Sequence, residues 1–145
     1  THDPKYIKLL VEKLKNFDIV ISSRFLEKNL LENWPMSRII ITRLRHFMVS
    51  FFLSMPYDAS GAFRCINCQR ITLSDLIVAK NNSYAFFWES IFILHRKKYR
   101  IGQISVQLPY RMIGSSKMKV KDIFSAIYYL MIVFFKRILG KYNFK

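Results

Sequence analysis

The chain has 145 residues, a formal net charge of +15, and 52% hydrophobic and 16% aromatic residues. This content excludes a disordered tail and predicts one domain with a substantial core. The positive charge predicts attraction to nucleic acid, to an anionic membrane surface, or to substrates that carry phosphate. Residues 90–121 contain no carboxylate and eight basic residues: Arg96, Lys97, Lys98, Arg100, Arg111, Lys117, Lys119 and Lys121.

The N-terminal part of the chain predicts a helix, a strand and a loop. Asp3 and Pro4 are a favourable helix start, with Asp3 as the N-cap and Pro4 at the first helical position. Residues 17–22 (FDIVIS) predict a short buried strand, and the polar residues 23–35 predict a loop. The apolar residues of the first helix recur at helical spacing: Ile7, Leu10, Val11 and Leu14.

A second helix is predicted from Ser37, a candidate N-cap, to about Leu53. Arg38, Thr42 and Arg45 are spaced so that they share one face of this helix. The elements predicted after it are a strand at 62–69, a short helix at 72–80, an amphipathic helix at 84–97, a strand at 100–110 and a helix at 123–139.

This order of elements, α-β-α-β-α-α-β-α, is typical of an α/β domain. The chain starts at Thr1 without an initiator Met, and we interpret it as a fragment or a trimmed chain. The sheet is therefore expected to continue one that begins upstream. Such a truncated sheet would have an exposed edge.

The last predicted helix has two main interpretations. Residues 123–135 are nearly all apolar, and Lys121, Lys136 and Arg137 flank them. Because a bilayer-spanning helix needs about 20 apolar residues, a full span is disfavoured, and part of a span is the third alternative. A short apolar helix with basic ends fits a helix that lies in the plane of a membrane surface, and it also fits a core helix that covers the sheet.

The two cysteines, Cys65 and Cys68, form a single C-x-x-C pair. A tetrahedral zinc site needs two further ligands that this sequence does not place nearby. A redox pair would open a helix, whereas this one lies in a predicted strand. We expect ordinary reduced cysteines, as in a cytosolic setting.

No Ser-His-Asp, Cys-His or metal-ligand pattern is visible, but arginines recur beside small or hydroxyl residues. Arginine forks combined with the backbone N–H groups of Gly/Ser turns commonly hold phosphate oxygens. The sequence therefore predicts a site for phosphate groups. The four segments that show this pattern are residues 22–24 (SSR), Arg38 with Thr42, residues 60–64 (SGAFR) and residues 111–117 (RMIGSSK).

These segments, in this order, resemble the C-terminal half of a family 2 glycosyltransferase of the dolichol-phosphate or polyprenyl-phosphate mannosyltransferase type. The resemblance covers residues 1 to about 120. It implies that the chain begins just after the metal-binding D-x-D motif of that family, because THDP matches the tail of the motif. The matching segments are residues 1–4 (THDP), 21–24 (ISSR), 34–38 (WPMSR), 58–64 (DASGAFR), 84–89 (YAFFWE) and 111–117 (RMIGSSK).

The resemblance implies an α/β domain of the GT-A type, the Rossmann-like fold of nucleotide-diphospho-sugar transferases, truncated at its N-terminus. Residues 1–118 would form its C-terminal half, and residues 119–145 a basic, apolar helix at the membrane surface. The implied activity is inverting transfer of a mannose or glucose-like sugar from GDP-mannose or a UDP-sugar to a polyprenyl phosphate. It would take place at the cytoplasmic face of a membrane. The complete enzyme would need Mg²⁺ or Mn²⁺, with no metal ligand within this chain.

The resemblance also implies roles for individual residues. Arg24, Arg38 and Thr42 would surround the acceptor phosphate, with Arg64 as a further phosphate-binding residue. Two departures from the family pattern are Thr42, where another hydroxyl residue is usual, and the extra residue Ala62. Asp58 and Glu89 would lie near the sugar. Arg111, Ser116 and Lys117 would belong to a loop that closes over the donor diphosphate and the acceptor. The implied catalytic residues are Asp58, Glu89 and Arg111.

The chemistry agrees with these residue types. A lipid phosphate is already ionised near neutral pH, so it needs little help from a general base. The departing nucleotide diphosphate needs positive charge, and the reacting atoms need to be held in line. The abundance of Arg and Lys and the scarcity of His fit this requirement.

Simpler interpretations stay open for the same residues. Arg24, Arg111 and Lys117 are also plausible as surface charges, Asp58 as the start of an Asx-type turn, and Glu89 as half of a structural ion pair. Trp34 and Trp88 are expected to be packing residues. Three other functions compete: a family 2 enzyme with a saccharide acceptor, a basic module that binds membranes without catalysis, and a nucleic-acid-binding module. Aromatics that fall on apolar helix faces disfavour the last, so no nucleic acid partner is expected.

Overall fold

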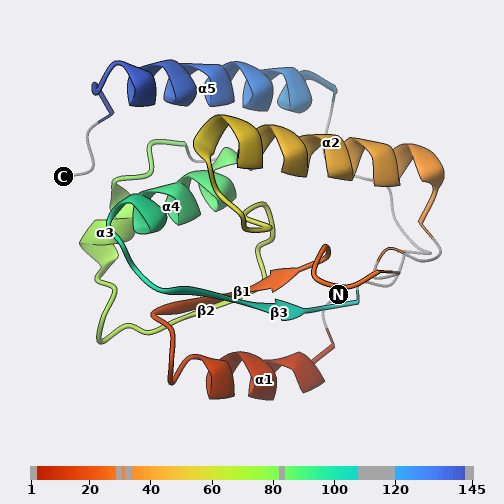
Figure 1. Ribbon diagram of the computed structural model, residues 1–145, viewed down its shortest axis with the longest axis vertical. Coiled ribbons are helices and arrows are strands. Elements are labelled where there is room, and N and C mark those ends of the chain that lie inside the picture. The colour runs from red at the N-terminus through yellow and green to blue at the C-terminus, as the bar shows by residue number, and fades with distance from the viewer. Residues whose placement is uncertain (1–2, 29–30, 32–33, 82–83, 108–119, 143–145) are drawn as a thin grey trace.

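The chain folds into a mixed α/β structure with a small three-stranded sheet (Figure 1). The computed structural model describes residues 3–28, 31, 34–81, 84–107 and 120–142. The order of elements predicted from the sequence is confirmed in this part of the chain. The elements are α1 (Lys5–Lys13), β1 (Ile19–Ser23), α2 (Met36–Leu53), β2 (Arg64–Ile66), α3 (Leu73–Ile77), α4 (Ala85–Arg96), β3 (Ile101–Ser105) and α5 (Val120–Ile138).

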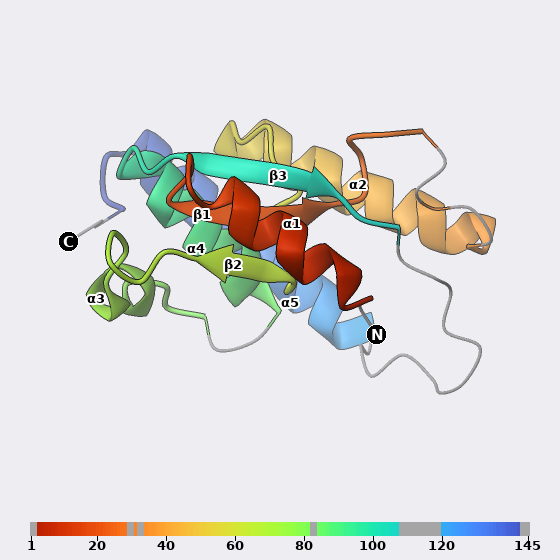
Figure 2. The same ribbon diagram turned by 90° about the horizontal axis from the view of Figure 1, so that it is seen from below.

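The sheet has the order β2-β1-β3, with β1 in the centre. β1 runs parallel to β3 and antiparallel to β2, and Ile19 lies opposite both Ile101 and Ile66. α1 crosses one face of the sheet, and α2, α4 and α5 lie on the other side (Figures 1 and 2). All five residues of β1 are buried, as expected for a central strand covered on both faces.

The helix α4 is buried on nearly all sides. Its residues from Trp88 to Leu94 are all buried, so the amphipathic pattern predicted for residues 84–97 is wrong. The helix lies between the sheet and α5 (Figure 1), which leaves no side of its middle turns for solvent. The larger of the two hydrophobic cores forms around it.

The helix α1 buries a narrower stripe than its apolar pattern predicts. Leu10 is buried and Tyr6 and Leu14 pack beside it against the sheet, whereas Ile7 and Val11 are exposed. The residues of α1 that pack against the sheet are thus spaced at i, i+4 and i+8, which is one narrow face of the helix.

The caps of both helices differ from the predicted ones, by one residue in α1 and by two residues in α2. α1 begins at Lys5 with Pro4 at the cap, although the Oδ1 atom of Asp3 accepts the N–H of Lys5 at 2.9 Å. α2 begins at Met36 with Pro35 at the cap, so Ser37 lies inside the helix. Proline suits a helix start because its missing N–H would have no partner there.

The helix α5 has one face in the core and one at the surface. Leu130 and Val133 are buried, whereas Phe124, Tyr128 and Phe135 are exposed. None of the helices that the structure describes has the length and apolarity needed to cross a membrane. α5 therefore covers the core, and its outer side remains apolar.

Cys65 is the middle residue of β2, and Cys68 follows the end of that strand. Cys65 is half-buried against the core beneath α1, and Cys68 is exposed beyond the strand. Both thiols are free of a disulfide, and the redox setting of the pair stays a prediction.

Close packing at Gly102 generates a first testable prediction. A Cβ atom at this position in β3 would lie 2.8 Å from Cγ of Phe17, closer than real Cβ atoms approach a ring. A Gly102→Ala variant should therefore lose about 1–3 kcal/mol of unfolding free energy through overpacking. In a strand without this contact, the same change would be neutral or stabilising. Urea denaturation followed by circular dichroism measures the difference.

The control repeats Gly102→Ala in a Phe17→Ala background, where the ring is absent. The cost of the alanine should then largely disappear. An equal cost in both backgrounds would show that the ring contact is not its cause.

Candidate functional site

Polar side chains gather at the carboxyl end of β1 and beside the middle of β3. Arg24 follows β1 directly, Gln103 belongs to β3, and Asp58 and Ser60 come from the loop that follows α2. The chain enters this loop through Ser54, whose left-handed conformation (φ 53°) ends α2 and turns the backbone. In α/β proteins, the carboxyl ends of parallel strands are the usual place for a ligand site.

Arg24 and Asp58 form a buried, multiply bonded ion pair. The Arg24 side chain donates from Nε to Oδ2 of Asp58 at 2.8 Å and from Nη2 to Oδ1 at 2.7 Å. The backbone N–H of Arg24 donates to Oδ2 at 3.0 Å, and its Nη2 also reaches Oγ of Ser60 at 2.7 Å. The side chain of Asp58 is wholly inaccessible to solvent and that of Arg24 is 10% exposed. Such a fork-to-fork pair holds both partners in one orientation.

The ion pair decides the charge state of Asp58. Burial alone would raise the pKa of this carboxyl group, but the hydrogen bonds and the charge of Arg24 outweigh burial and lower the pKa. The backbone N–H of Asp58 also donates to Oε1 of Gln103 at 3.0 Å, which ties the loop to β3. Asp58 is thus a carboxylate at neutral pH, and it neutralises much of the charge of Arg24.

The underside of α2 brings further cations to this edge. Thr42 is buried, and Arg45 and His46 are half-buried on the same helix. The charges of Arg24, Asp58 and Arg38 all act on Arg45, so Arg45 lies within electrostatic range of the ion pair.

Two aromatic contacts fix side chains of α2. The guanidinium group of Arg38 lies 4.5 Å from the ring centre of Trp34. The ring of His46 stacks on Phe25 with 4.2 Å between their centres. Burial lowers the pKa of His46. The charge of Asp58 raises this pKa and the charges of Arg24 and Arg45 lower it, and the net lowering favours the neutral ring.

Arg45 is a site residue that sequence reasoning did not select, although its spacing from Arg38 indicated the shared face. Burial lowers its pKa to about 10, and repulsion from Arg24 adds to this effect. The group is therefore still a cation at neutral pH. Ser60 belongs to the SGAFR segment that the sequence analysis singled out, although no role was assigned to it. Gln103 was missed, because nothing in its local sequence distinguishes it from an ordinary polar residue.

Arg64 lies near the start of α4 and uses its donors there. Its Nη1 donates to Oγ of Ser90 at 2.8 Å, and its Nη2 donates to the carbonyl oxygens of Gly61 at 2.7 Å and Phe87 at 3.0 Å. Burial lowers the pKa of Arg64 to about 10. The structure thus gives Arg64 a role in holding the loop against α4, and its role as a phosphate ligand stays a prediction.

Glu89 is completely buried and accepts hydrogen bonds from two directions. Its Oε2 accepts the backbone N–H groups of Lys80 at 3.1 Å and Asn81 at 3.0 Å. Its Oε1 accepts the hydroxyl groups of Tyr129 at 2.7 Å and Tyr142 at 2.6 Å. Burial and the hydrogen bond to Glu89 raise the pKa of both tyrosines, so they remain neutral donors.

Glu89 therefore joins α4 to α5 through Tyr129, and to the segment that follows α5 through Tyr142. Its hydrogen-bond partners in the described part of the chain are backbone amides and tyrosine hydroxyl groups, and none of them is an Arg or Lys side chain. Its proposed place near the sugar stays a prediction. Arg111, Ser116 and Lys117 lie outside the described residues, and their predicted roles stay predictions as well.

The described residues do not fit a metal centre. They contain no group of three or more His, Cys, Asp or Glu side chains that could hold an ion. The oxygens of Asp58 already accept from Arg24 and Ser60, and those of Glu89 accept from four other donors. We therefore assign no metal-dependent step to these side chains.

Comparisons with known proteins agree with the resemblance found in the sequence. No protein-family model matches the chain. The chain is 26% identical over 119 residues to an undecaprenyl-phosphate mannosyltransferase of Micrococcus luteus, an alignment that covers 81% of this chain and 49% of that protein. It is 20% identical over 130 residues to a polyprenol monophosphomannose synthase of Mycolicibacterium smegmatis, which covers 88% of this chain and 49% of that protein.

The predicted resemblance to polyprenyl-phosphate mannosyltransferases is thus confirmed, at low identity. The chain spans about half the length of the curated relatives that it matches. Which half of the relatives it corresponds to stays a prediction.

The buried ion pair yields the second prediction. Asp58→Asn should lower the unfolding free energy by about 3–5 kcal/mol, because it leaves Arg24 buried without its counter-charge. Asp3→Asn breaks the exposed ion pair with Lys5 and should change the unfolding free energy far less, because solvent screens that pair. Chemical denaturation of both variants at neutral pH tests the contrast, and equal effects would contradict it.

The pH dependence of stability provides a second measurement on the same variants. The folded-state pKa of Asp58 lies below its ordinary value of 3.8. Its contribution to stability is therefore fully present above pH 3.8 and is lost as the pH falls through the lower folded-state pKa. The wild-type chain should lose more stability than Asp58→Asn between pH 5 and pH 2, roughly the window in which such a carboxylate titrates. Parallel curves would contradict this assignment.

Proposed function

We propose that this chain is the acceptor-binding part of a glycosyltransferase that moves mannose from a nucleotide-sugar donor to a polyprenyl phosphate. The observation that carries the proposal is the similarity to two polyprenyl-phosphate mannosyltransferases over more than four fifths of the chain. The cluster of cations at the carboxyl ends of parallel strands supports it, because a phosphate acceptor needs such a cluster.

The proposal includes the finer features that the resemblance implies. The domain would be of the GT-A type, with residues 1–118 as its C-terminal half and residues 119–145 as a helix at the membrane surface. The enzyme would belong to glycosyltransferase family 2, and GDP-mannose or a UDP-sugar would be the donor. Mg²⁺ or Mn²⁺ would assist the leaving diphosphate from outside the residues described here.

The residues of this chain would then act through charge and position. An ionised phosphate oxygen of the acceptor attacks the anomeric carbon from the side opposite the nucleotide diphosphate, which departs with the bonding electrons and leaves an inverted configuration. Arg38 and Thr42 would hold the acceptor phosphate near the Arg24–Asp58 pair. Arg111, Ser116 and Lys117 would close over the donor diphosphate and stabilise its developing charge. No proton has to be removed from the nucleophile.

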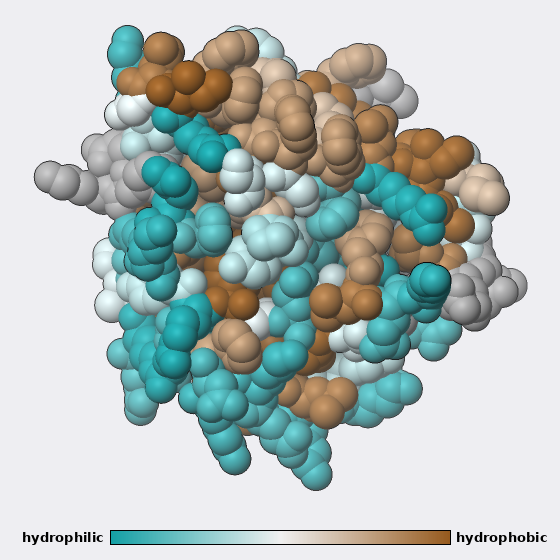
Figure 3. Space-filling model, in the orientation of Figure 1, coloured by the Kyte–Doolittle hydropathy of each residue, from teal (hydrophilic) through white to brown (hydrophobic). Residues whose placement is uncertain are grey.

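The outer surfaces of α2 and α5 support a place at a membrane. Hydrophobic residues gather over these helices at the top of Figure 3, whereas hydrophilic residues dominate the lower part, over α1 and the sheet. Contiguous exposed apolar surface of this kind marks an interaction site. The large apolar residues exposed on the two helices are Met36, Ile40, Ile41, Leu44, Phe47 and Phe51 of α2, and Phe124, Ile127, Tyr128, Phe135 and Ile138 of α5.

We propose that this surface lies on the cytoplasmic face of a membrane. Nucleotide sugars are made in the cytoplasm, and a polyprenyl acceptor presents its phosphate at the bilayer surface. The positive net charge of the chain would add attraction to anionic lipids.

Transfer of the sugar tests the proposed activity. The protein that carries this chain in its natural sequence context should transfer labelled mannose from GDP-mannose to undecaprenyl phosphate in a metal-dependent reaction. Arg111→Ala should lower turnover by on the order of a hundredfold or more, because it removes a charge that stabilises the transition state. Lys15→Ala, an exposed change beyond α1, should leave turnover unchanged.

Three outcomes would contradict parts of this proposal. Transfer to a saccharide but not to the prenyl phosphate would favour the alternative family 2 acceptor. Wild-type turnover in Arg111→Ala would mean that the loop assignment is wrong. The absence of transfer, together with tight binding of single-stranded nucleic acid, would favour a binding module.

Vesicle binding tests the proposed membrane surface. Phe47 and Phe51 stack on the outer side of α2, with 5.7 Å between their ring centres. The double variant Phe47→Ser/Phe51→Ser should weaken binding to phosphatidylglycerol-containing vesicles at least about tenfold, because each phenyl ring loses its apolar burial. Leu73→Ser/Ile77→Ser removes equally exposed apolar groups from α3 and should bind as the wild type does. Equal losses in both variants would mean that α2 has no special part in binding.

A further inference from the structure

Arg45 is half-buried and has an incomplete set of hydrogen bonds. Its Nε atom is buried without a hydrogen-bond partner, and the described residues provide no hydrogen bond or ion pair to its guanidinium group. Removing a guanidinium N–H from water without a partner costs free energy, which an anionic ligand at this position would offset. The guanidinium group of Arg24 differs from that of Arg45, because it already donates hydrogen bonds to Asp58 and Ser60.

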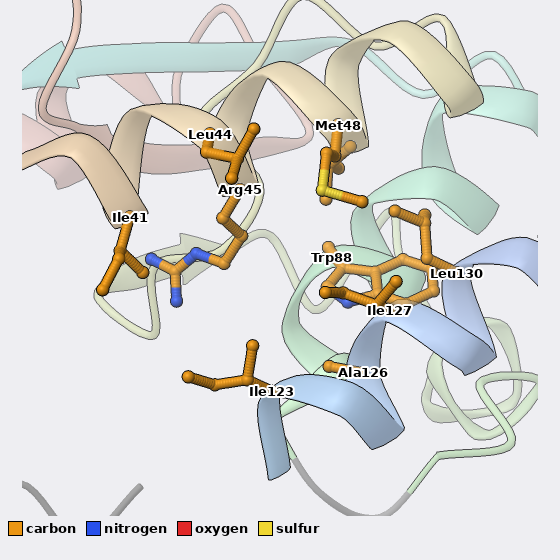
Figure 4. Close-up of a pocket in the computed structure, with 10 residues that line it drawn as sticks. Ile41, Leu44, Arg45, Met48, Trp88, Ile123, Ala126, Ile127 and Leu130 are labelled. Carbon is orange, nitrogen blue, oxygen red and sulfur yellow. The ribbon is translucent and has the colours of Figure 1, made fainter. Parts of the chain in front are cut away.

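The same arginine lines an apolar pocket between α2 and α5. The pocket has a volume of about 100 Å³, and Trp88 of α4 lies between the two helices. In Figure 4 the side chain of Arg45 extends from α2 toward Ile123 of α5, and the rest of the labelled lining is apolar. Arg45 is the one charged side chain in this lining.

We propose that Arg45 binds the phosphate of a prenyl monophosphate whose first isoprenoid unit occupies the pocket between α2 and α5. The inference rests on the proposed function and assigns the acceptor phosphate to a residue that the sequence resemblance did not include. It makes Arg45 a phosphate-binding residue, with Met48, Trp88, Ala126 and Leu130 in contact with the hydrocarbon.

Charge complementarity identifies the phosphate end of the ligand. Arg24 and Asp58 largely cancel each other, so this ion pair leaves the charge of Arg45 available to an anion. A phosphate monoester would supply the acceptors that the Arg45 guanidinium group lacks, in the planar geometry that arginine prefers.

Size and polarity identify the hydrocarbon end. An apolar cavity of about 150 Å³ stays dry and binds benzene, so the pocket is on the scale of one isoprenoid unit. Its neighbours Ile41, Leu44 and Ile127 are exposed apolar residues, so the rest of a long chain would pass from the pocket directly onto the apolar surface of α2 and α5. A free phosphate ion would leave the apolar walls unused.

Calorimetric titration of the 145-residue chain with farnesyl phosphate, inorganic phosphate and farnesol tests the inference. The wild type should bind farnesyl phosphate at least about tenfold more tightly than either of the other two, because only that probe satisfies both ends of the site. Arg45→Met keeps most of the length of the side chain but removes its charge. It should weaken the binding of farnesyl phosphate at least about tenfold. Arg43→Met, an exposed change on the same helix, is the control and should bind as the wild type does.

The hydrocarbon end has its own pair of variants. Ala126→Phe fills the pocket and should weaken the binding of farnesyl phosphate. Ser125→Phe places the same ring on the exposed side of α5 and should leave this binding unchanged. Thermal unfolding of each variant accompanies the titrations. Arg45→Met should be as stable as the wild type or more stable, because it removes an unpaired buried charge.

Each pattern of results supports or overturns the inference. Wild-type affinity in Arg45→Met would overturn it, as would a loss of stability in that variant, since Arg45 would then be a structural residue. Inorganic phosphate or farnesol that binds as tightly as farnesyl phosphate would also overturn it. In each of these cases the proposed mannosyl transfer would still be open to its own assay. A wild-type chain that binds no farnesyl phosphate would overturn the inference, and the transfer assay with undecaprenyl phosphate would decide separately on the proposed acceptor.

Discussion

The buried ion pair between Arg24 and Asp58 is the contact on which the candidate site depends. It joins the end of β1 to the loop that returns from α2, over 34 positions of sequence, with three hydrogen bonds from one residue to one carboxylate. Gln103 extends the connection to β3 through the backbone of Asp58. Because both parallel strands and the loop meet in this network, the position of α2 above the sheet is fixed by polar contacts as well as by packing.

The same pairing changes how the positive charge of the site is distributed. Arg24 has the sequence context of a phosphate ligand, yet most of its donors are directed at Asp58 and Ser60. The charge that is available for an anion therefore lies on α2, where Arg45 has no counter-ion among the described residues. Burial of an unpaired cation is unfavourable for stability, and binding of an anion would compensate for it. Under the proposed function, one side of α2 would bind the lipid phosphate and the other side would face the membrane.

Glu89 plays a corresponding part on the opposite side of the core. It lies fully buried in α4 and receives the hydroxyl groups of Tyr129 and Tyr142 as well as two backbone amides. This network, together with the bonds from Arg137 to Phe52 and Ser54, holds α5 beside α2. The pocket between the two helices, and their continuous apolar surface, exist because these polar contacts set the position of α5.

The sequence by itself determined the order of helices and strands, the resemblance to polyprenyl-phosphate mannosyltransferases, and the pattern of cations on α2. Each of these depends on local periodicity or on short motifs, which adjacent residues specify. The tertiary structure alone decided that Asp58 neutralises Arg24, that Glu89 pairs with two tyrosines, and that α4 is buried on nearly all sides. It also decided that Arg45, rather than Arg64, is the arginine without a partner at a pocket. The physical reason is that a buried charge finds its partner in a segment 20 or more positions away along the chain. The local sequence carries no signal about that segment, so it gives neither the partner nor the free-energy cost of burying the charge.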